Sequence, residues 1–268
     1  MENESKIKIN FSYIADFNKQ KQFILMAICI TCMCNLFATF VSADIVYNTT
    51  SPIATILIVA IMADEITESG NGWTSGFYFL FGIFFWALSD ILVIIYTYFE
   101  VGSNFLEAIS DTLYLMPNYT FMLAFFLLIF FRCDKKQKKL LVIGESLVTI
   151  ILGVTYAQYV NIDFGVSGYT SEYGVSAVAY AIPVIYIFST ILILFIIRDI
   201  RKEGKAFYMV LAGIFIYNIL ELRYTYYTAA HLEPELPVLD VVYLATMILI
   251  ALAYNDPTMN HKEKNEKV

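Results

Sequence analysis

Acidic side chains within or beside long apolar segments are the residues of this chain most able to do chemistry. Asp90 and Glu221 interrupt two apolar segments, and Asp111 and Asp240 stand near the start of two others. A carboxylate in hydrocarbon costs at least about 2.5–3.5 kcal/mol, so each one should face a partner, a cavity or water. Clustered carboxylates bind cations and share protons, which serves ligand binding, proton-coupled sensing or general acid catalysis.

A basic residue and several aromatic residues accompany these acids. Arg223 is two residues from Glu221, and such neighbours point to different sides of a helix, so we expect Arg223 to reach an acid on another helix. It should then lie inside a ring of four carboxylates. The predicted ligand-binding residues are Asp90, Asp111, Glu221, Asp240, Arg223, Tyr114, Tyr243 and Trp86.

Structural roles for the acids stay open beside this interpretation. An acid in the first turn of a helix interacts favourably with the helix dipole and can cap the helix, which applies to Asp111 and Asp240. A buried network of Arg223 with the acids would also serve simply to hold helices together. Glu145, six residues into an apolar run, is expected to extend toward Lys138 or Lys139 at the membrane surface.

The cysteines and histidines predict no metal or haem centre. Cys29 and Cys32 have the spacing of a redox or metal pair, but they lie in an apolar run without partner ligands, so we interpret them as small helix residues. His231 and His261 cannot supply the facing intramembrane pair of a haem or the helix-borne pair of a zinc protease. We expect no cofactor. Asn118 begins a tripeptide of the glycosylation pattern, to which we assign no role.

Composition places all these residues in a membrane. The 268 residues are 59% apolar and 15% charged, whereas soluble domains are about 45–50% apolar and about 25% charged. Mean hydropathy is +0.66, and the net charge of -7 argues against a nucleic-acid partner. The sequence predicts an all-α, polytopic bundle of about eight transmembrane helices in the lipid bilayer, from apolar runs near 22–43, 53–66, 76–98, 108–131, 139–160, 174–197, 206–226 and 237–255.

The basic residues predict the orientation. Eight crossings with both termini cytoplasmic place 16 of the 17 Lys and Arg residues inside, and omitting the second crossing leaves 12 of 17. We therefore expect a multi-pass protein of the cell membrane, with a cytoplasmic segment 1–21, a transmembrane domain 22–255 and a cytoplasmic tail 256–268. The second run is short, so whether 53–66 crosses fully stays open; Ser51 and Pro52 would begin its helix.

Two parts of the chain resemble each other. GIFFWALSDILVIIYTYF from Gly82 aligns with GIFIYNILELRYTYY from Gly213, so that Asp90 matches Glu221. In the following helices, Asp111 matches Asp240 and Tyr114 matches Tyr243. The third and fourth helices thus form a parallel repeat with the seventh and eighth, for which we expect a rotation of roughly 180° about the membrane normal. Pro117 and Pro183 are expected to kink two helices and open a cavity.

This pattern resembles the eight-helix membrane sensor regions that precede diguanylate cyclase and histidine kinase domains. The residues that carry the resemblance are Trp73, Trp86, Asp90, Asp111, Tyr114, Asp240 and Tyr243. It implies a sensor that binds a small amphipathic or cationic ligand in an acidic, aromatic-lined cavity open to the extracellular side. Only twelve residues follow Asp256, so we expect any output to come from a separate protein.

Ser89 and Asp90 also resemble the Ser-Asp helix of the YhhN-type lysoplasmalogenases, which are eight-helix membrane hydrolases. In that family the motif lies nearer the C-terminus. The resemblance implies an alternative function as an intramembrane lysolipid hydrolase, with Asp90 and an acid of the second repeat acting as acid and base. Whether the chain is an enzyme stays open, and a small-molecule or ion transporter is a third interpretation.

Overall fold

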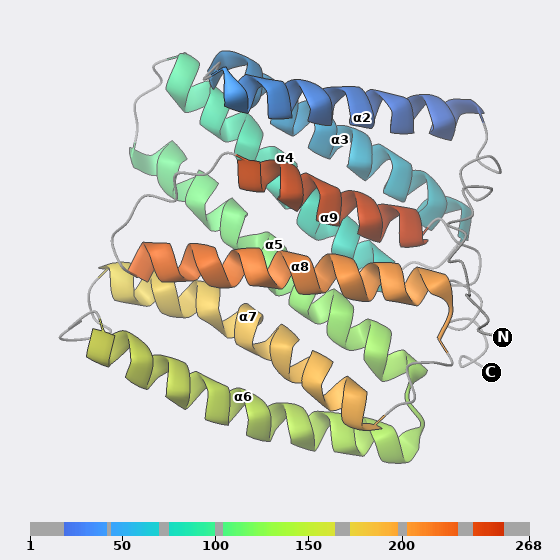
Figure 1. The fold of residues 1–268 in the computed structure, drawn as a ribbon, viewed down its shortest axis with the longest axis vertical. Helices are drawn as coiled ribbons and strands as arrows, with labels where there is room; N and C mark the ends of the chain where they lie inside the picture. The colour runs from blue at the N-terminus through green and yellow to red at the C-terminus, as the bar shows by residue number, and fades with distance from the viewer. Residues whose placement is uncertain are drawn as a thin grey trace, which may run out of the picture.

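Six of the eight predicted apolar runs lie entirely within one helix, and the runs 22–43 and 237–255 extend past the helix ends that the structure describes. Helices can cross lipid because they satisfy their backbone hydrogen bonds internally. The computed structural model describes residues 19–41, 44–69, 75–99, 104–163, 172–197, 203–229 and 238–254. Within these residues the fold is all helical, with the labels of Figure 1: α2 (Lys19–Phe40), α3 (Asp44–Ser69), α4 (Ser75–Tyr98), α5 (Asn104–Arg132), α6 (Lys135–Asp163), α7 (Glu172–Ile197), α8 (Lys205–Ala229) and α9 (Val238–Tyr254).

Successive helices alternate in direction, so that their ends form two opposite ends of one bundle (Figure 1). Six of the described helices are long and apolar enough to cross a membrane, which confirms a helical, multi-pass membrane protein. The apolar parts of α3 and α9 are shorter, covering Asn48–Asp64 and Leu239–Tyr254. Residues 1–18 of the predicted cytoplasmic segment 1–21, the predicted tail 256–268 and Trp73 lie outside the described residues.

The prediction that α3 begins at Ser51 and Pro52 is wrong. α3 begins at Asp44 and continues through Pro52. The preceding turn is held by side chains: Asn48 Nδ2 donates to the Tyr98 hydroxyl at 2.8 Å, and Thr50 Oγ1 lies 2.9 Å from the Val46 carbonyl. These contacts offset the backbone hydrogen bond that proline lacks. α5 and α7 likewise run on through Pro117 and Pro183 as single helices.

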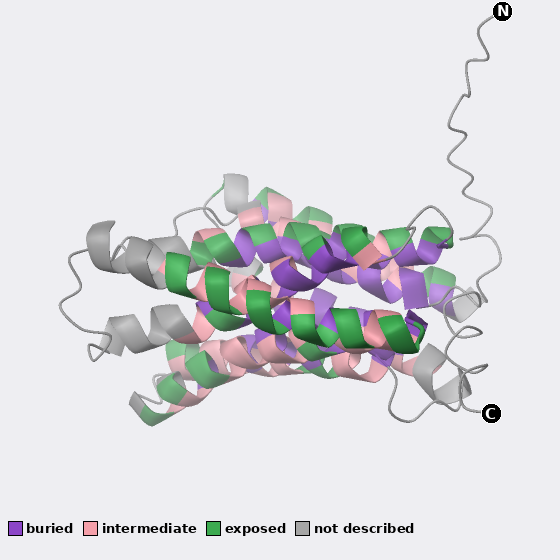
Figure 2. Ribbon diagram, turned by 90° about the horizontal axis from the view of Figure 1, so that it is seen from below, coloured by how far each residue is buried: buried purple, intermediate pink, exposed green. Residues whose placement is uncertain are grey.

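Buried positions lie between the helices, and exposed positions follow their outer sides (Figure 2). Two glycines permit close contact between neighbouring helices. A Cβ on Gly82 of α4 would lie 2.5 Å from the ring of Phe121 on α5, and a Cβ on Gly213 of α8 would lie 3.0 Å from Ile250 of α9. The missing side chains therefore let α4 approach α5, and α8 approach α9.

The two ends of the bundle differ in charge. Among the described residues, every Lys and Arg except Arg223 lies near the end at which α2, α6 and α8 begin. At that end Arg132 Nη1 lies 2.9 Å from Glu203 Oε2, and both side chains are buried. The Arg132 guanidinium also stands 5.2 Å from the centre of the Phe207 ring. This pair joins the end of α5 to the segment before α8.

Candidate functional site

A cavity of about 220 Å³ lies between the helices near the end opposite the basic residues. α3, α5, α7 and α9 start at this end, and residues near their beginnings line the cavity. α4 and α8 finish at this end, and residues toward their ends complete the lining. The lining residues are Asn48, Ser51, Pro52, Trp86, Asp90, Val93, Ile94, Tyr114, Tyr180, Glu221, Tyr224, Asp240, Tyr243 and Leu244. Three acidic and five aromatic side chains thus converge from helices far apart in the sequence.

Asp90 of α4 is buried and held by donors from two other helices. The Tyr114 hydroxyl of α5 donates to Asp90 Oδ1 at 2.6 Å, and Ser51 of α3 donates to Oδ2 at 3.1 Å. Trp86, one helical turn before Asp90, also hydrogen-bonds to the carboxylate. Each carboxylate oxygen therefore has a donor, which fixes the orientation of Asp90 at the cavity wall.

Glu221 of α8 is held in a similar way from the other side. Asn118 Nδ2 of α5 donates to Glu221 Oε2 at 2.9 Å, and Tyr243 of α9 also hydrogen-bonds to this carboxylate. The Tyr217 hydroxyl donates to Asn118 Oδ1 at 2.6 Å. Because Tyr217 occupies the amide oxygen, the Asn118 amide presents its NH₂ group to Glu221.

Asp240 differs from Asp90 and Glu221 in its contacts with the described residues. It lies in the first turn of α9 and lines the cavity. No residue within the described ranges donates a hydrogen bond to its side chain. Its position fits a favourable interaction with the helix dipole, and its carboxylate stays available to a ligand.

Aromatic rings form the floor of the cavity. The Trp86 ring lies 5.0 Å from that of Tyr243, 6.0 Å from that of Tyr114 and 6.3 Å from that of Tyr217, measured between centroids. The three tyrosines belong to α9, α5 and α8. Rings packed in this way are rigid, and their faces attract cations.

Positions that align between the two similar segments make similar contacts. Tyr114 hydrogen-bonds to Asp90, and Tyr243 hydrogen-bonds to Glu221. Trp86 packs on Tyr114 at 6.0 Å, and Tyr217, which aligns with Trp86, packs on Tyr243 at 5.6 Å. Gly82 faces Phe121, and Gly213 faces Ile250, which is the residue that aligns with Phe121.

The structure places six of the eight predicted site residues around one cavity, namely Asp90, Glu221, Asp240, Tyr114, Tyr243 and Trp86. Arg223 and Asp111 do not line it, so the predicted ring of four carboxylates around Arg223 differs from the structure. Arg223 follows Glu221 by two residues, which turns it about 200° around α8 and away from the cavity.

Asp111 also departs from its predicted capping role. α5 begins at Asn104, so Asp111 stands two turns inside the helix. Its side chain is exposed, and it interacts electrostatically with Tyr180, a lining residue of the cavity. Asp111 therefore stands beside the cavity rather than in its wall.

Among the residues that contribute to the site and were not predicted are Ser51, Asn118, Tyr180 and Tyr217. A signal existed for Asn118, because it follows Tyr114 by four residues and so shares its face of α5. Tyr217 aligns with Trp86, a predicted site residue, when the segments from Gly213 and Gly82 are compared, and this alignment also indicated a place in the site. Ser51 had none, since it was interpreted as the start of a helix and reaches Asp90 only through the packing of α3 on α4.

Ser89 does not share the cavity with Asp90. Its hydroxyl lies 2.8 Å from both the carbonyl oxygen and the hydroxyl of Ser110 on α5, and its side chain is fully buried. This serine therefore joins α4 to α5 and is not presented to a molecule in the cavity.

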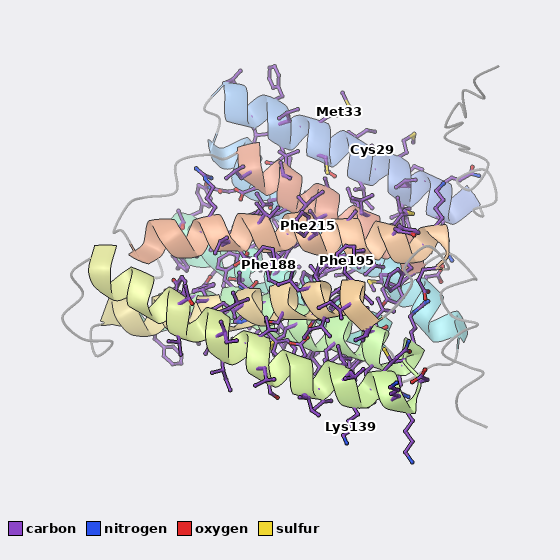
Figure 3. The ribbon with its side chains drawn as sticks, turned by 60° about the horizontal axis from the view of Figure 1, so that its bottom comes forward. Cys29, Met33, Lys139, Phe188, Phe195 and Phe215 are labelled. Atoms are coloured by element: carbon purple, nitrogen blue, oxygen red, sulfur yellow. The ribbon has the colours of Figure 1, made fainter. Side chains whose placement is uncertain are left out.

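Glu145 contradicts the expectation that it extends toward lysines. Its side chain is 2% exposed and accepts a hydrogen bond from Thr190 of α7. The Lys138 ammonium instead stands 5.0 Å from the centre of the Phe130 ring. Lys139 points away from the bundle, as Figure 3 shows. Glu145 lies on the side of α6 that faces α7, whereas Lys138 and Lys139 lie on other sides of the helix.

Within the described residues, no group of three or more His, Cys, Asp or Glu side chains is placed to hold a metal ion. Comparison of the chain with protein-family models, with curated proteins and with solved structures gave no significant match.

Proposed function

We propose that this protein is a membrane-embedded sensor or binding module that holds the cationic group of a small ligand in the acidic, aromatic-lined cavity. The observation that carries the proposal is the convergence of Asp90, Glu221 and Asp240 on one cavity of about 220 Å³.

Charge and ring chemistry support a cation as the ligand. No Lys, Arg or His is among the described residues that line the cavity. Asp240 has no protein donor within the described ranges, so a ligand cation would satisfy a group that the fold leaves without a partner. The faces of Trp86, Tyr114 and Tyr243 favour an ammonium group, because aromatic rings attract cations most strongly where water is excluded.

The proposal includes a parallel repeat of α4–α5 and α8–α9. It is supported by the matched contacts of Tyr114 with Asp90 and of Tyr243 with Glu221. A ligand between the repeats would then contact one carboxylate from each repeat. A small movement of one repeat relative to the other would carry the effect of ligand binding to the opposite end of the bundle.

We place the cavity on the extracellular side and both termini in the cytoplasm. The positive-inside rule supports this orientation, because the described basic residues other than Arg223 lie at the other end of the bundle. In a cysteine-free background, Phe99→Cys at the cavity end should react with an impermeant maleimide in intact cells. Lys139→Cys at the other end should react only after permeabilisation. The opposite pattern would refute the orientation.

Ligand binding can be tested with choline and 3,3-dimethylbutan-1-ol, its neutral isostere in which carbon replaces nitrogen. Trp86 lines the cavity, so replacing the other tryptophan by Trp73→Phe makes Trp86 fluorescence the readout in detergent-solubilised protein. Choline should change this fluorescence saturably, and the neutral isostere should not. Equal responses to both compounds would refute recognition of a cation.

Charge-removing variants identify the groups that hold the ligand. Asp240→Asn should weaken choline binding by roughly tenfold, as expected when about 1.4 kcal/mol is lost. Asp90→Asn and Glu221→Gln should weaken it as well, with thermal unfolding used to confirm that the variants fold. Glu145→Gln, distant from the cavity lining, is the matched control and should bind choline like the wild type. Wild-type affinity for choline in all three cavity variants would show that these acids do not bind the ligand.

A lysolipid hydrolase remains the alternative, because Asp90 and Glu221 line the same cavity and could act as acid and base. Purified protein incubated with lysoplasmalogen would then release free aldehyde, and Asp90→Asn would abolish the release. The burial of Ser89 against Ser110 favours binding over a reaction that uses this serine. A transporter would instead be revealed by choline flux into proteoliposomes.

A further inference from the structure

A second polar site lies near the middle of the membrane-spanning part of α6. Glu145 comes ten residues after the start of α6, about 15 Å along the helix, and about 9 Å beyond Lys139, the last lysine of the basic segment. It is therefore well inside the hydrocarbon, where an acidic side chain is costly. The described chain gives it no ion pair.

One oxygen of this carboxyl group has no hydrogen-bond partner. Thr190 donates to Glu145 Oε1, whereas Oε2 is buried and unpaired. The Thr149 hydroxyl stands nearby, but its single proton is directed to Ser189 Oγ at 3.2 Å, and Ser189 donates in turn to the Ile185 carbonyl at 2.9 Å. Neither Thr149 nor Ser189 thus has a proton left for Oε2, and a buried polar atom in this state costs about 1–3 kcal/mol.

The carboxyl group borders a groove of about 350 Å³ on the side of the bundle. The groove is lined by Phe126, Val142, Glu145, Ser146, Thr149, Ile150 and Tyr186. Val142, Ser146 and Ile150 are exposed on the outer side of α6, which lies at the edge of the bundle (Figure 1). The groove therefore opens toward the acyl chains of the bilayer and not toward the first cavity.

From this geometry we infer that the groove binds a membrane-dissolved amphiphile with an amine head. The amine donates to Glu145 Oε2 and supplies the positive charge that the protein does not provide there. The hydrocarbon chain lies along Phe126, Val142 and Ile150. A bare monovalent cation fits less well, because three of the seven lining side chains are purely apolar and two of the three lining hydroxyls, those of Ser146 and Thr149, already donate within the protein.

Labelling with dicyclohexylcarbodiimide tests the site in nanodiscs of neutral lipid. This reagent dissolves in the bilayer, and a carboxylic acid adds to it, with the oxygen bonding to the central carbon and the proton moving to nitrogen. Wild-type protein should be labelled at Glu145, as read by peptide mass spectrometry. Dodecylamine at about ten times its dissociation constant should slow labelling about tenfold, since that is the ratio of occupied to empty sites. Dodecanol, sodium chloride and choline should leave the rate of labelling unchanged.

Two variants separate this site from the first cavity. Glu145→Gln should lose the label while keeping the acceptor for Thr190, and dodecylamine should no longer raise its melting temperature. Asp90→Asn should keep both the label and the protection by dodecylamine. Absence of label in the wild type, equal protection by dodecanol, or protection by sodium ions would overturn the proposal.

Discussion

Three glycine-to-alanine substitutions test whether close helix packing positions the cavity. Each adds one methyl group inside a helix, and each gains roughly 0.5–1 kcal/mol of helix propensity. They differ in the space available. The added Cβ meets Phe121 Cε1 and Thr120 Oγ1 at 2.5 Å in Gly82→Ala, Ile250 at 3.0 Å in Gly213→Ala, and no atom within 4 Å in Gly153→Ala.

The displacement at Gly82 can be calculated from these distances. Ordinary contact begins at 3.4 Å, so if the helices alone moved to relieve the clash, α4 and α5 would separate by up to 3.4 − 2.5 = 0.9 Å. The Phe121 ring is fully buried, packed 4.9 Å from the Tyr217 ring, and has no space to rotate aside. The same rigid shift would lengthen the Tyr114–Asp90 hydrogen bond from 2.6 Å to 3.5 Å, the limit of a hydrogen bond. Overpacking of this kind costs about 1–3 kcal/mol.

We therefore expect Gly82→Ala to be less stable than Gly153→Ala by about 1–3 kcal/mol, with Gly213→Ala between them. Unfolding by dodecyl sulfate in mixed micelles, followed by helical circular dichroism, measures the differences. Choline binding should weaken in Gly82→Ala and stay unchanged in Gly153→Ala. Equal stability of these two variants would refute the reasoning, because they share the propensity gain and differ only in packing.

Two further predictions concern buried polar contacts. Glu203→Gln removes the negative charge that pairs with buried Arg132 and should lower the free energy of unfolding by about 3–5 kcal/mol. Asp64→Asn removes the charge that pairs with Lys21, and because this aspartate is 44% exposed, the free energy of unfolding should fall by at most about 1 kcal/mol. The same micelle titration distinguishes them, and equal losses would count against the buried pair. Asn118→Ala removes the donor to Glu221 and should cost about 1–3 kcal/mol while weakening choline binding; unchanged affinity would show that orientation of Glu221 is unimportant.

Helices were predictable from the sequence because lipid imposes a strong length and composition constraint. Six of the eight apolar runs lie entirely within one of the described helices, including the short second run that became part of α3. The convergence of Asp90 and Glu221 was predictable for a related reason. Carboxylates in hydrocarbon must find polar surroundings, and an alignment of two helix pairs indicated that both would lie at the same depth.

Contacts that depend on how a helix is rotated about its axis were not predictable. Arg223 was expected to reach an acid on another helix because it cannot pair with Glu221 two residues away, but with Glu221 facing the cavity the helix turns Arg223 away from all three cavity acids. Glu145 was placed with Lys138 by proximity along the chain, although its face of α6 meets Thr190 of α7. Neither rotation is fixed by an apolar pattern, since a membrane helix is apolar on all sides.

If the cavity binds a cation as proposed, differences among its three acids predict which acid the cation lies beside. Asp90 receives donors from Ser51 and Tyr114, and Glu221 receives them from Asn118 and Tyr243. α3 supplies the extra donor in the first repeat, whereas α5 supplies it in the second. Asp240 has no such donor from the described helices. A cation entering the cavity would therefore gain most beside Asp240, with the two satisfied carboxylates acting through their longer-range charge.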